Sequence, residues 1–231
     1  MSNSELVSYT RLLNNCHKMS NKQNKKITIH HMAGNLSLKK LGDVFVSRKS
    51  SANYGIDSNG NIGLYVNECD CAWTSASYDN DSQAVTIEVA NNKLDPEWTI
   101  SDKAMKSLIN LCVDICKRNN IKELVFTGDK NGTLTYHYMF ANTACPGPYI
   151  KSKTTYICEC VNALLNGQDK QVASPIKTTK TNEELAVEVI RGLWGVYPER
   201  KKLLEEAGYN YSEVQKIVNQ LMNAKYNVYF D

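Results

Sequence analysis

The chain has 231 residues, of which 42% are hydrophobic and 22% are charged, so it has the composition of a globular protein with one domain and room for a small second one. Its net charge of +3 is too small to indicate nucleic-acid binding by itself, although it suits contact with an anionic polymer. The N-terminus lacks the apolar core of a signal peptide, and no run approaches the ~18 apolar residues of a membrane helix. We therefore expect synthesis in the cytoplasm, with release by another factor if the target lies outside.

Six segments of the first part of the chain predict regular elements. Strands are expected at residues 27–32, 61–66, 84–90 and 123–127, which are β-branched and apolar. A helix is expected after the capping residue Ser101, ending at Arg118, and another near 156–165. The first helix carries an apolar stripe of Ala104, Leu108, Leu111, Cys112 and Ile115. This order predicts an α/β domain over residues 1–165, built on a central sheet.

The rest of the chain predicts a linker and a small helical module. Residues 166–181 are polar and aperiodic, as in a linker, and residues 182–231 contain three short helical patterns. Gly192 and Gly208 stand at expected helix ends, and Ser212 and Gln215 have capping-box spacing. The expected core is Leu185, Val189, Leu203, Val214, Ile217, Val218 and Leu221. A module of about 40 residues should be only marginally stable.

Eight cysteines are present, and none has the CxxC spacing of zinc ribbons or thioredoxin-like sites. Since we expect a reducing compartment, we interpret all of them except Cys145 as buried thiols. Cys145 differs because it directly precedes the rigid sequence Pro-Gly-Pro and follows His137 by eight residues. The sequence therefore predicts that a thiol and an imidazole are held on one stiff loop.

Strand alternation separates two adjacent histidines. His30 should point away from Ile27 and Ile29 and can reach a cleft, whereas His31 should be a hydrogen-bonded core residue. His30, His137 and Cys145 together match the catalytic zinc pattern of three protein ligands and an open position, although by residue types alone a histidine with a distant cysteine is more often structural. Glu88 can share the face of His30, although residue types alone leave a solvated strand glutamate equally plausible.

Four motifs, in this order, carry a resemblance to a known family: ITIHHMAG, SANYGIDSNG, AVTIEVAN and HYMFANTACPGPY. Over roughly residues 20–165 the chain resembles the zinc-dependent N-acetylmuramoyl-L-alanine amidases of the type-2 class, especially endolysins and autolysins of clostridia and their phages. These share the fold of the peptidoglycan recognition proteins, which implies a mixed central sheet flanked by helices. The resemblance implies that His30, His137 and Cys145 bind Zn²⁺, that Glu88 is the general base and acid, and that Thr143 donates to the oxyanion.

Two positions depart from the family. Ala52 stands where another branch of the superfamily has a catalytic tyrosine, which places this chain in the branch that relies on Glu88. Asn53 stands where a histidine is common, and we predict that Asn53 and Trp73 contact substrate. Tyr54 can line the same groove, but core packing is at least as plausible for it.

The C-terminal module resembles the cell-wall-binding repeat of some pneumococcal phage lysozymes and many other lysins. The resemblance rests on EVI-G-WG, R-x3-L-x2-AGY-Y and VQ-x2-VN. It implies binding to the muropeptide of peptidoglycan, with Trp194, Arg200 and Tyr209 as contacts. The alternative is that Trp194 and Tyr209 form the core of the bundle. A single repeat should bind modestly and act by local concentration.

These observations predict a phage endolysin that cuts the amide between N-acetylmuramic acid and L-alanine in clostridial peptidoglycan, with no nucleic-acid or membrane partner. A host autolysin of the same activity is the alternative. A non-catalytic peptidoglycan-binding protein is the second hypothesis, and a structural zinc site in a nucleic-acid-binding domain is the third. The scattered basic residues argue against the third hypothesis.

Overall fold

The computed structural model describes residues 2–167, 181–190, 194, 196–206 and 209–227. It contains two compact units, Met1–Pro175 and Ile176–Asp231. Most of the expected linker, residues 166–181, lies outside the described residues. Each unit is described by itself.

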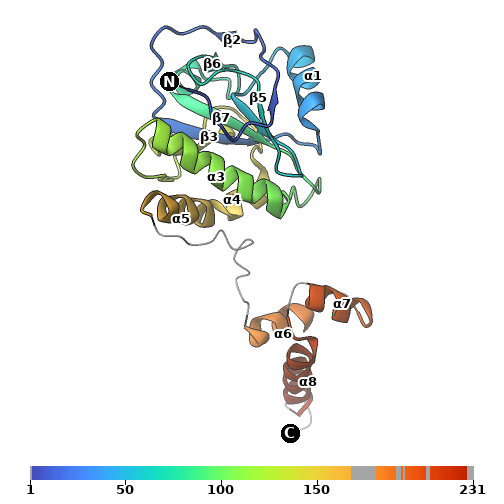
Figure 1. Cartoon of the computed structure of the whole chain (residues 1–231). Coiled ribbons are helices and arrows are strands. Elements are labelled where there is room, and N and C mark those ends of the chain that lie inside the picture. Colours follow the sequence, from blue (N-terminus) through green and yellow to red (C-terminus); the bar gives the residue numbers. More distant parts are fainter. Residues whose placement is uncertain (1, 168–180, 191–193, 195, 207–208, 228–231) are drawn as a thin grey trace. The chain divides into compact units, whose positions relative to one another are not determined.

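The first unit is built on a six-stranded mixed sheet (Figure 1). The strands, in spatial order, are β1 (Tyr9–Thr10), β5 (Ile62–Leu64), β4 (Tyr54–Ile56), β7 (Ala84–Val89), β3 (Lys26–His31) and β8 (Leu134–Tyr136). Neighbouring strands are parallel except β4 and β5, which are antiparallel. A separate antiparallel pair joins β2 (Cys16–His17) to β6 (Cys71–Ala72). The prediction of a mixed central sheet flanked by helices is confirmed.

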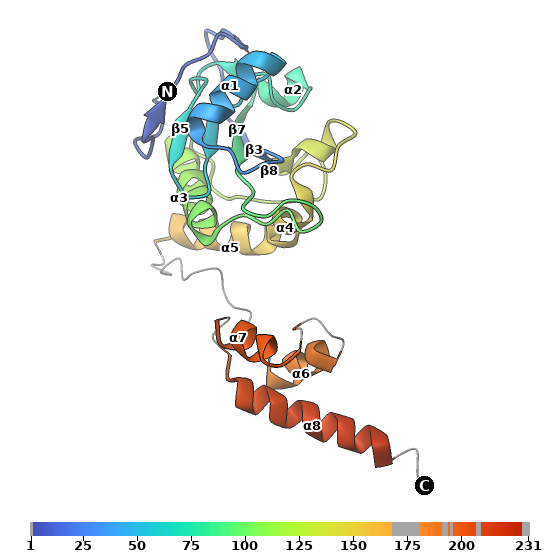
Figure 2. The same ribbon diagram turned by 90° about the vertical axis from the view of Figure 1, so that its right-hand side faces the viewer.

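Helices cover both faces of this sheet. The helices α3 (Asp102–Arg118) and α5 (Thr154–Leu165) pack on the face that carries Ile27 and Ile29, where the predicted α3 stripe is buried. The helix α1 (Leu38–Arg48) packs on the opposite face, because Leu41 lies against Gly55, the β4 partner of Glu88 (Figure 2). The shorter helices are α2 (Tyr78–Asp81), η1 (His137–Met139) and α4 (Gly147–Ser152). The candidate residues His30 and Glu88 lie on this face toward α1.

The described residues 123–127 form no strand, so that prediction is wrong. The side-chain amide of Asn162 in α5 takes both backbone groups of Leu124: its Oδ1 accepts from the amide at 2.7 Å and its Nδ2 donates to the carbonyl at 3.0 Å. The segment still lies beside the sheet, since Leu134 donates to the Val125 carbonyl. The strand that pairs with β3 at this edge of the sheet is β8.

All eight cysteines lie within the described residues, and none of them forms a disulfide. Cys71, Cys112 and Cys116 are buried, as expected. Cys69 is exposed, and Cys16, Cys158 and Cys160 are half-buried, so the expectation of general burial is wrong for these four. The role of a small buried apolar side chain therefore fits only some of these cysteines.

Among its described residues, the second unit contains three helices, α6 (Asn182–Ile190), α7 (Glu199–Glu206) and α8 (Tyr211–Asn227). Leu203 and Leu221 were expected in its core but are 38% and 41% exposed, and Leu204 is buried instead. Asn210 caps α8 by accepting from the amides of Ser212 and Glu213, so the predicted capping box is wrong. The buried core is Leu185, Ala186, Val189, Leu204, Val214 and Val218.

The expected helix ends Gly192 and Gly208 lie outside the described residues. Among the helices that the structure describes, none has the length and apolar character needed to cross a membrane.

Candidate metal and catalytic site

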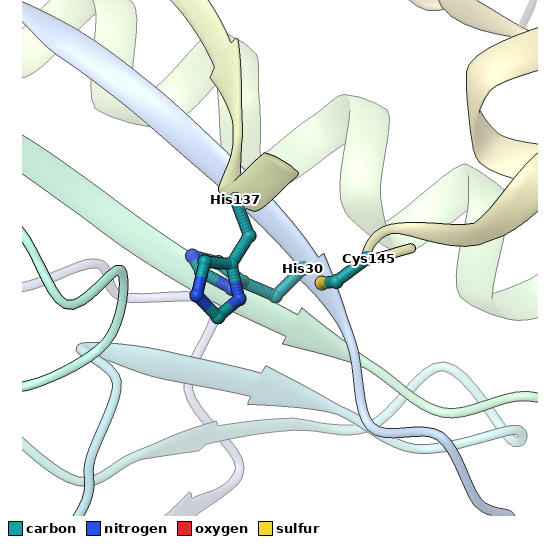
Figure 3. A group of neighbouring side chains, drawn as sticks. All are labelled: His30, His137 and Cys145. Atoms are coloured by element: carbon teal, nitrogen blue, oxygen red, sulfur yellow. The ribbon is translucent and has the colours of Figure 1, made fainter. Parts of the chain in front are cut away.

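His30, His137 and Cys145 converge on one point in the first unit (Figure 3). One ligand atom from each lies within 4.8 Å of the others. His30 comes from β3, His137 begins η1 directly after β8, and Cys145 lies just before α4. Two imidazoles and one thiol at this separation can hold a transition metal ion.

The local structure explains how residues far apart in sequence meet here. Strand β8 pairs with β3 through Tyr136 and Ile29, so the chain leaves the sheet at His137, beside His30. The amide of Tyr138 donates to the Cys145 carbonyl at 3.1 Å and closes the loop between the two ligands. The His31 amide donates to Sγ of Cys145 at 3.4 Å, which fixes the sulfur against β3.

Burial sets the protonation of the three groups. His30 is 1% exposed, and among the described residues its Nε2 has no hydrogen-bond partner. Desolvation lowers the pKa of His30 and of His137, so both imidazoles are held neutral, as metal ligands must be. Desolvation, and then the nearby Glu88 carboxylate, raise the pKa of Cys145. A bound cation would offset that burial cost, and the donor set therefore fits a zinc ion.

Glu88 lies opposite His30 in the parallel pairing of β3 and β7. Burial raises the pKa of Glu88 to about 8, and its Oε2 has no partner among the described residues. The side chain as a whole is half-buried and forms part of a groove wall. A carboxyl group with this pKa can hold or release a proton near neutral pH.

Thr143 lies on the same loop as Cys145. Its Oγ1 accepts from the Cys145 amide at 3.2 Å, which leaves the hydroxyl proton for another acceptor. Thr143, Glu88, His137 and Cys145 all line one groove. The hydroxyl can therefore donate to an oxygen placed in that groove.

Two grooves meet at His137 and Ser50, which line both. The first, of about 230 Å³, runs along α1, and we call it the α1 groove. Its lining includes apolar residues and the exposed Arg48. The second, of about 390 Å³, has the rings of His17, Trp73 and Tyr78 in its wall, and we call it the aromatic groove.

The other expected site residues fall into two groups. Trp73 is 37% exposed and lines the aromatic groove next to His137, as a substrate contact requires. Asn53 is fully buried, and its amide donates to the Val66 and Asn67 carbonyls and accepts from Thr86. Since every polar atom of that amide bonds within the protein, we no longer assign Asn53 to substrate. Ala52 and Tyr54 are core residues.

His31 differs from its expected role as a hydrogen-bonded core residue. It is half-buried, lines the α1 groove and packs edge-on against Trp98, with ring centroids 5.0 Å apart. Its Nδ1 has no hydrogen-bond partner in the described part of the chain. The reason is that β3 ends at His31, so strand alternation no longer places its ring inside the sheet core.

Sequence reasoning missed His17, Tyr78 and Arg48 as groove residues. Tyr78 follows Trp73 by five residues in a polar segment, and this pair of aromatic residues was an available signal. His17 and Arg48 carried no local signal, because only the pairing of β2 with β6 and the position of α1 bring them to the grooves.

In the second unit, the three expected contacts are half-buried. Trp194 and Tyr209 pack against the helical core, edge-on to each other at 6.1 Å, and Trp194 Nε1 donates to Glu188. Arg200 donates to the Gln215 side-chain oxygen at 3.1 Å. All three therefore have a packing role, and part of each side chain remains accessible.

Comparisons with solved structures identify the fold. The Staphylococcus aureus hydrolase AmiA in complex with its ligand aligns with a TM-score of 0.56 at 11% identity, over 69% of this chain and 85% of that one. The protein PlyL aligns with a TM-score of 0.52 at 12% identity, over 66% and 95%. The endolysin amidase LysCS from Clostridium intestinale URNW aligns at 18% identity with a TM-score of 0.49, over 65% and 95%. None of the curated proteins matches the chain.

Two family models match the sequence. Residues 183–222 match the CW_7 repeat, which covers α7 and most of α6 and α8. Residues 20–148, more than half of the chain, match the N-acetylmuramoyl-L-alanine amidase model and include His30, Glu88, His137, Thr143 and Cys145. The chain therefore belongs to the N-acetylmuramoyl-L-alanine amidase family, and it carries a CW_7 repeat.

Proposed function

We propose that the protein is a zinc-dependent peptidoglycan amidase that hydrolyses the bond between N-acetylmuramic acid and the L-alanine of the stem peptide. The observation that carries this proposal is the convergence of His30, His137 and Cys145 beside Glu88. The membership of the chain in an amidase family supports the reaction class.

His30, His137 and Cys145 would hold the zinc ion, since they offer two neutral imidazoles and one thiol. When bound, zinc lowers the pKa of water and polarises a carbonyl group. The buried and unpartnered Nε2 of His30 supports this assignment, because an orphaned polar atom in a dry site is costly without a ligand.

The protein's own groups supply the remaining chemistry. Glu88 accepts a proton from the attacking water and returns it to the leaving nitrogen, a role that its pKa of about 8 suits. Thr143 donates its hydroxyl proton to the oxygen that becomes negative in the tetrahedral intermediate. The walls of the α1 groove keep these groups partly away from water.

We assign catalysis to residues 1–165, a linker to residues 166–181 and wall binding to residues 182–231. The CW_7 repeat supports the last assignment, with Trp194, Arg200 and Tyr209 as the proposed contacts. The module keeps the enzyme on its polymeric substrate by raising the local concentration. The similarity of the four sequence motifs favours a clostridial wall as the target and a phage endolysin as the type of enzyme.

The test measures zinc content and lysis of purified clostridial walls for the native chain, Cys145→Ser and the control Cys69→Ser, whose thiol is exposed. We expect equimolar zinc, lysis and new N-terminal alanine on the digested walls for the native chain and the control. Cys145→Ser should lose both zinc and lysis. A zinc-loaded native chain that binds walls without releasing new N-terminal alanine would show that the protein only binds peptidoglycan.

A further inference from the structure

The aromatic groove is an additional feature of the site. The ring of His17 lies 5.4 Å from that of Trp73 and 5.5 Å, edge-on, from that of Tyr78. Tyr78 is 58% exposed and Trp73 is 37% exposed, so both present ring surface to solvent. His17 lies outside the residues 20–148 that match the amidase model, and the pairing of β2 with β6 brings it to this groove.

The groove carries little available charge. Asp81 lines it, but its carboxylate accepts from the amides of Thr74 and Ser75, from the Ser75 hydroxyl and from Asn80. No lysine or arginine of the described chain lines the aromatic groove. It therefore offers exposed aromatic rings and the hydroxyls of Ser50 and Ser77, which suit a neutral ligand with both apolar and hydroxyl-bearing surfaces.

The α1 groove differs from the aromatic groove because an arginine lines it. The exposed Arg48 lines it together with the apolar residues Leu36 and Phe45. An arginine recognises carboxylates, which stem peptides carry and uncharged sugar rings do not. The two grooves meet at His137, one of the three proposed zinc ligands, so a bond between a sugar and a peptide can lie at that junction.

We propose that the aromatic groove binds the glycan strand of the substrate, with sugar rings packed against Trp73 and Tyr78 and with His17 holding these rings in place. The stem peptide then runs along the α1 groove toward Arg48. This inference rests on the proposed function, because it assigns the two arms of the amidase substrate to the two grooves. It predicts that glycan length, and not only peptide sequence, determines the specificity constant.

The test compares two soluble substrates with the same stem peptide, one on a single N-acetylmuramic acid and one on a tetrasaccharide of alternating N-acetylglucosamine and N-acetylmuramic acid. The readout is the ratio of kcat/KM for the tetrasaccharide to kcat/KM for the monosaccharide. We expect Trp73→Ala and Tyr78→Ala to lower this ratio about tenfold, mainly through KM, which corresponds to about 1.4 kcal/mol. Trp73→Phe and Tyr78→Phe should keep most of it, because a ring remains. Val125→Ala, at a side chain that is 37% exposed and outside both grooves, should leave the ratio at the native value.

Three results would overturn the assignment. An unchanged ratio in both alanine variants would show that the rings do not contact the glycan. An equal loss on both substrates together with a lower Tm would show that the rings only hold the N-terminal segment in place. A ratio that depends on the length of the stem peptide would place the peptide in this groove.

Failure of the proposed function gives a different result, in which the native chain cleaves neither substrate. In that case, calorimetry measures binding of the tetrasaccharide, which tests the groove assignment without any hydrolysis. Binding that is lost in Tyr78→Ala supports the groove assignment, and absence of binding by the native chain rejects it.

Discussion

At the scale of single residues, one geometric rule places the proposed catalytic groups. Alternate residues of a strand point to opposite faces, and β3 and β7 pair in register, so His30 and Glu88 lie side by side on the face toward α1. The apolar residues that alternate with them along the two strands, such as Ile29 and Ile87, fill the core on the other face. The same burial that isolates His30 raises the pKa of Glu88 to about 8.

Glu88→Gln removes the carboxylate but keeps its size and can still donate a hydrogen bond. We expect wall hydrolysis to fall by about 10²–10⁴-fold, the usual contribution of a general acid or base, with no loss of bound zinc. Zinc content and the rate of release of N-terminal alanine are measured on the same samples. Glu97→Gln, at an exposed position, is the matched control and should behave as the native chain does. Native activity in Glu88→Gln would remove this residue from the mechanism.

At the scale of elements, side chains from neighbouring helices decide what some segments become. Residues 123–127 have the composition of a strand, but Asn162 of α5 takes both backbone hydrogen-bonding groups of Leu124. This hydrogen bond cannot be predicted from the local sequence, because its two partners are 38 residues apart. The side chain of Asn162 therefore makes the backbone hydrogen bonds at Leu124 that a neighbouring strand would otherwise make.

Asn162→Ala should leave the amide and the carbonyl of the buried Leu124 without these partners. We expect a loss of about 1–3 kcal/mol in the free energy of unfolding for an unsatisfied buried polar group. Urea unfolding measures it. Asn166→Ala is the control, since Asn166 is exposed at the end of the same helix and should change stability much less. Equal effects of the two substitutions would mean that the bond to Leu124 is not what stabilises the segment.

The thiols of α3 predict how stability depends on alkaline pH. Burial raises the pKa of Cys116 from 9.0 to about 12 and also raises the pKa of Cys112. The folded state therefore holds protons that the unfolded state releases, so this stabilisation is fully present below pH 9 and is lost as the pH rises toward 12. In this range, each such thiol lowers the free energy of unfolding by about 1.4 kcal/mol per pH unit.

Cys116→Ala should make the alkaline loss of stability less steep by about that amount. Urea unfolding at pH 9, 10 and 11 under reducing conditions measures the slope. Cys69→Ala, which removes an exposed thiol, should leave the slope as it is in the native chain. A native slope in Cys116→Ala would show that this thiol does not stay protonated in the folded state.

At the scale of the whole molecule, the chain contains two units with separate cores. In the part of the second unit that the structure describes, six apolar residues are buried as one cluster, and all of them lie in α6, α7 and α8. At the usual stability per residue, a unit of this size has only a few kcal/mol of stability, about 3–8. Loss of one core side chain should therefore unfold it while the first unit stays folded.

The neighbouring leucines of α7 make this test specific. Leu204 is fully buried and Leu203 is 38% exposed. Leu204→Ala should cost about 2–5 kcal/mol, which is comparable to the total stability of the unit, and Leu203→Ala should cost clearly less. Hydrogen exchange of the α6 and α8 amides should then become fast in Leu204→Ala only, while α3 exchange stays slow. Fast exchange in α3 as well would mean that the two units do not unfold independently.

The sequence by itself determined the fold class, the helices α3 and α5 and three of the four predicted strands, and its family resemblance pointed to the five residues proposed for the chemistry. It did so because strand alternation, helix capping and motif order are local properties. Tertiary structure alone decided that Asn53 is buried and that His31 lines a groove. It also decided that 123–127 forms no strand and that His17, Tyr78 and Arg48 reach the grooves. These outcomes depend on which distant segment covers a side chain or forms a hydrogen bond with the backbone. A local sequence pattern does not identify that segment.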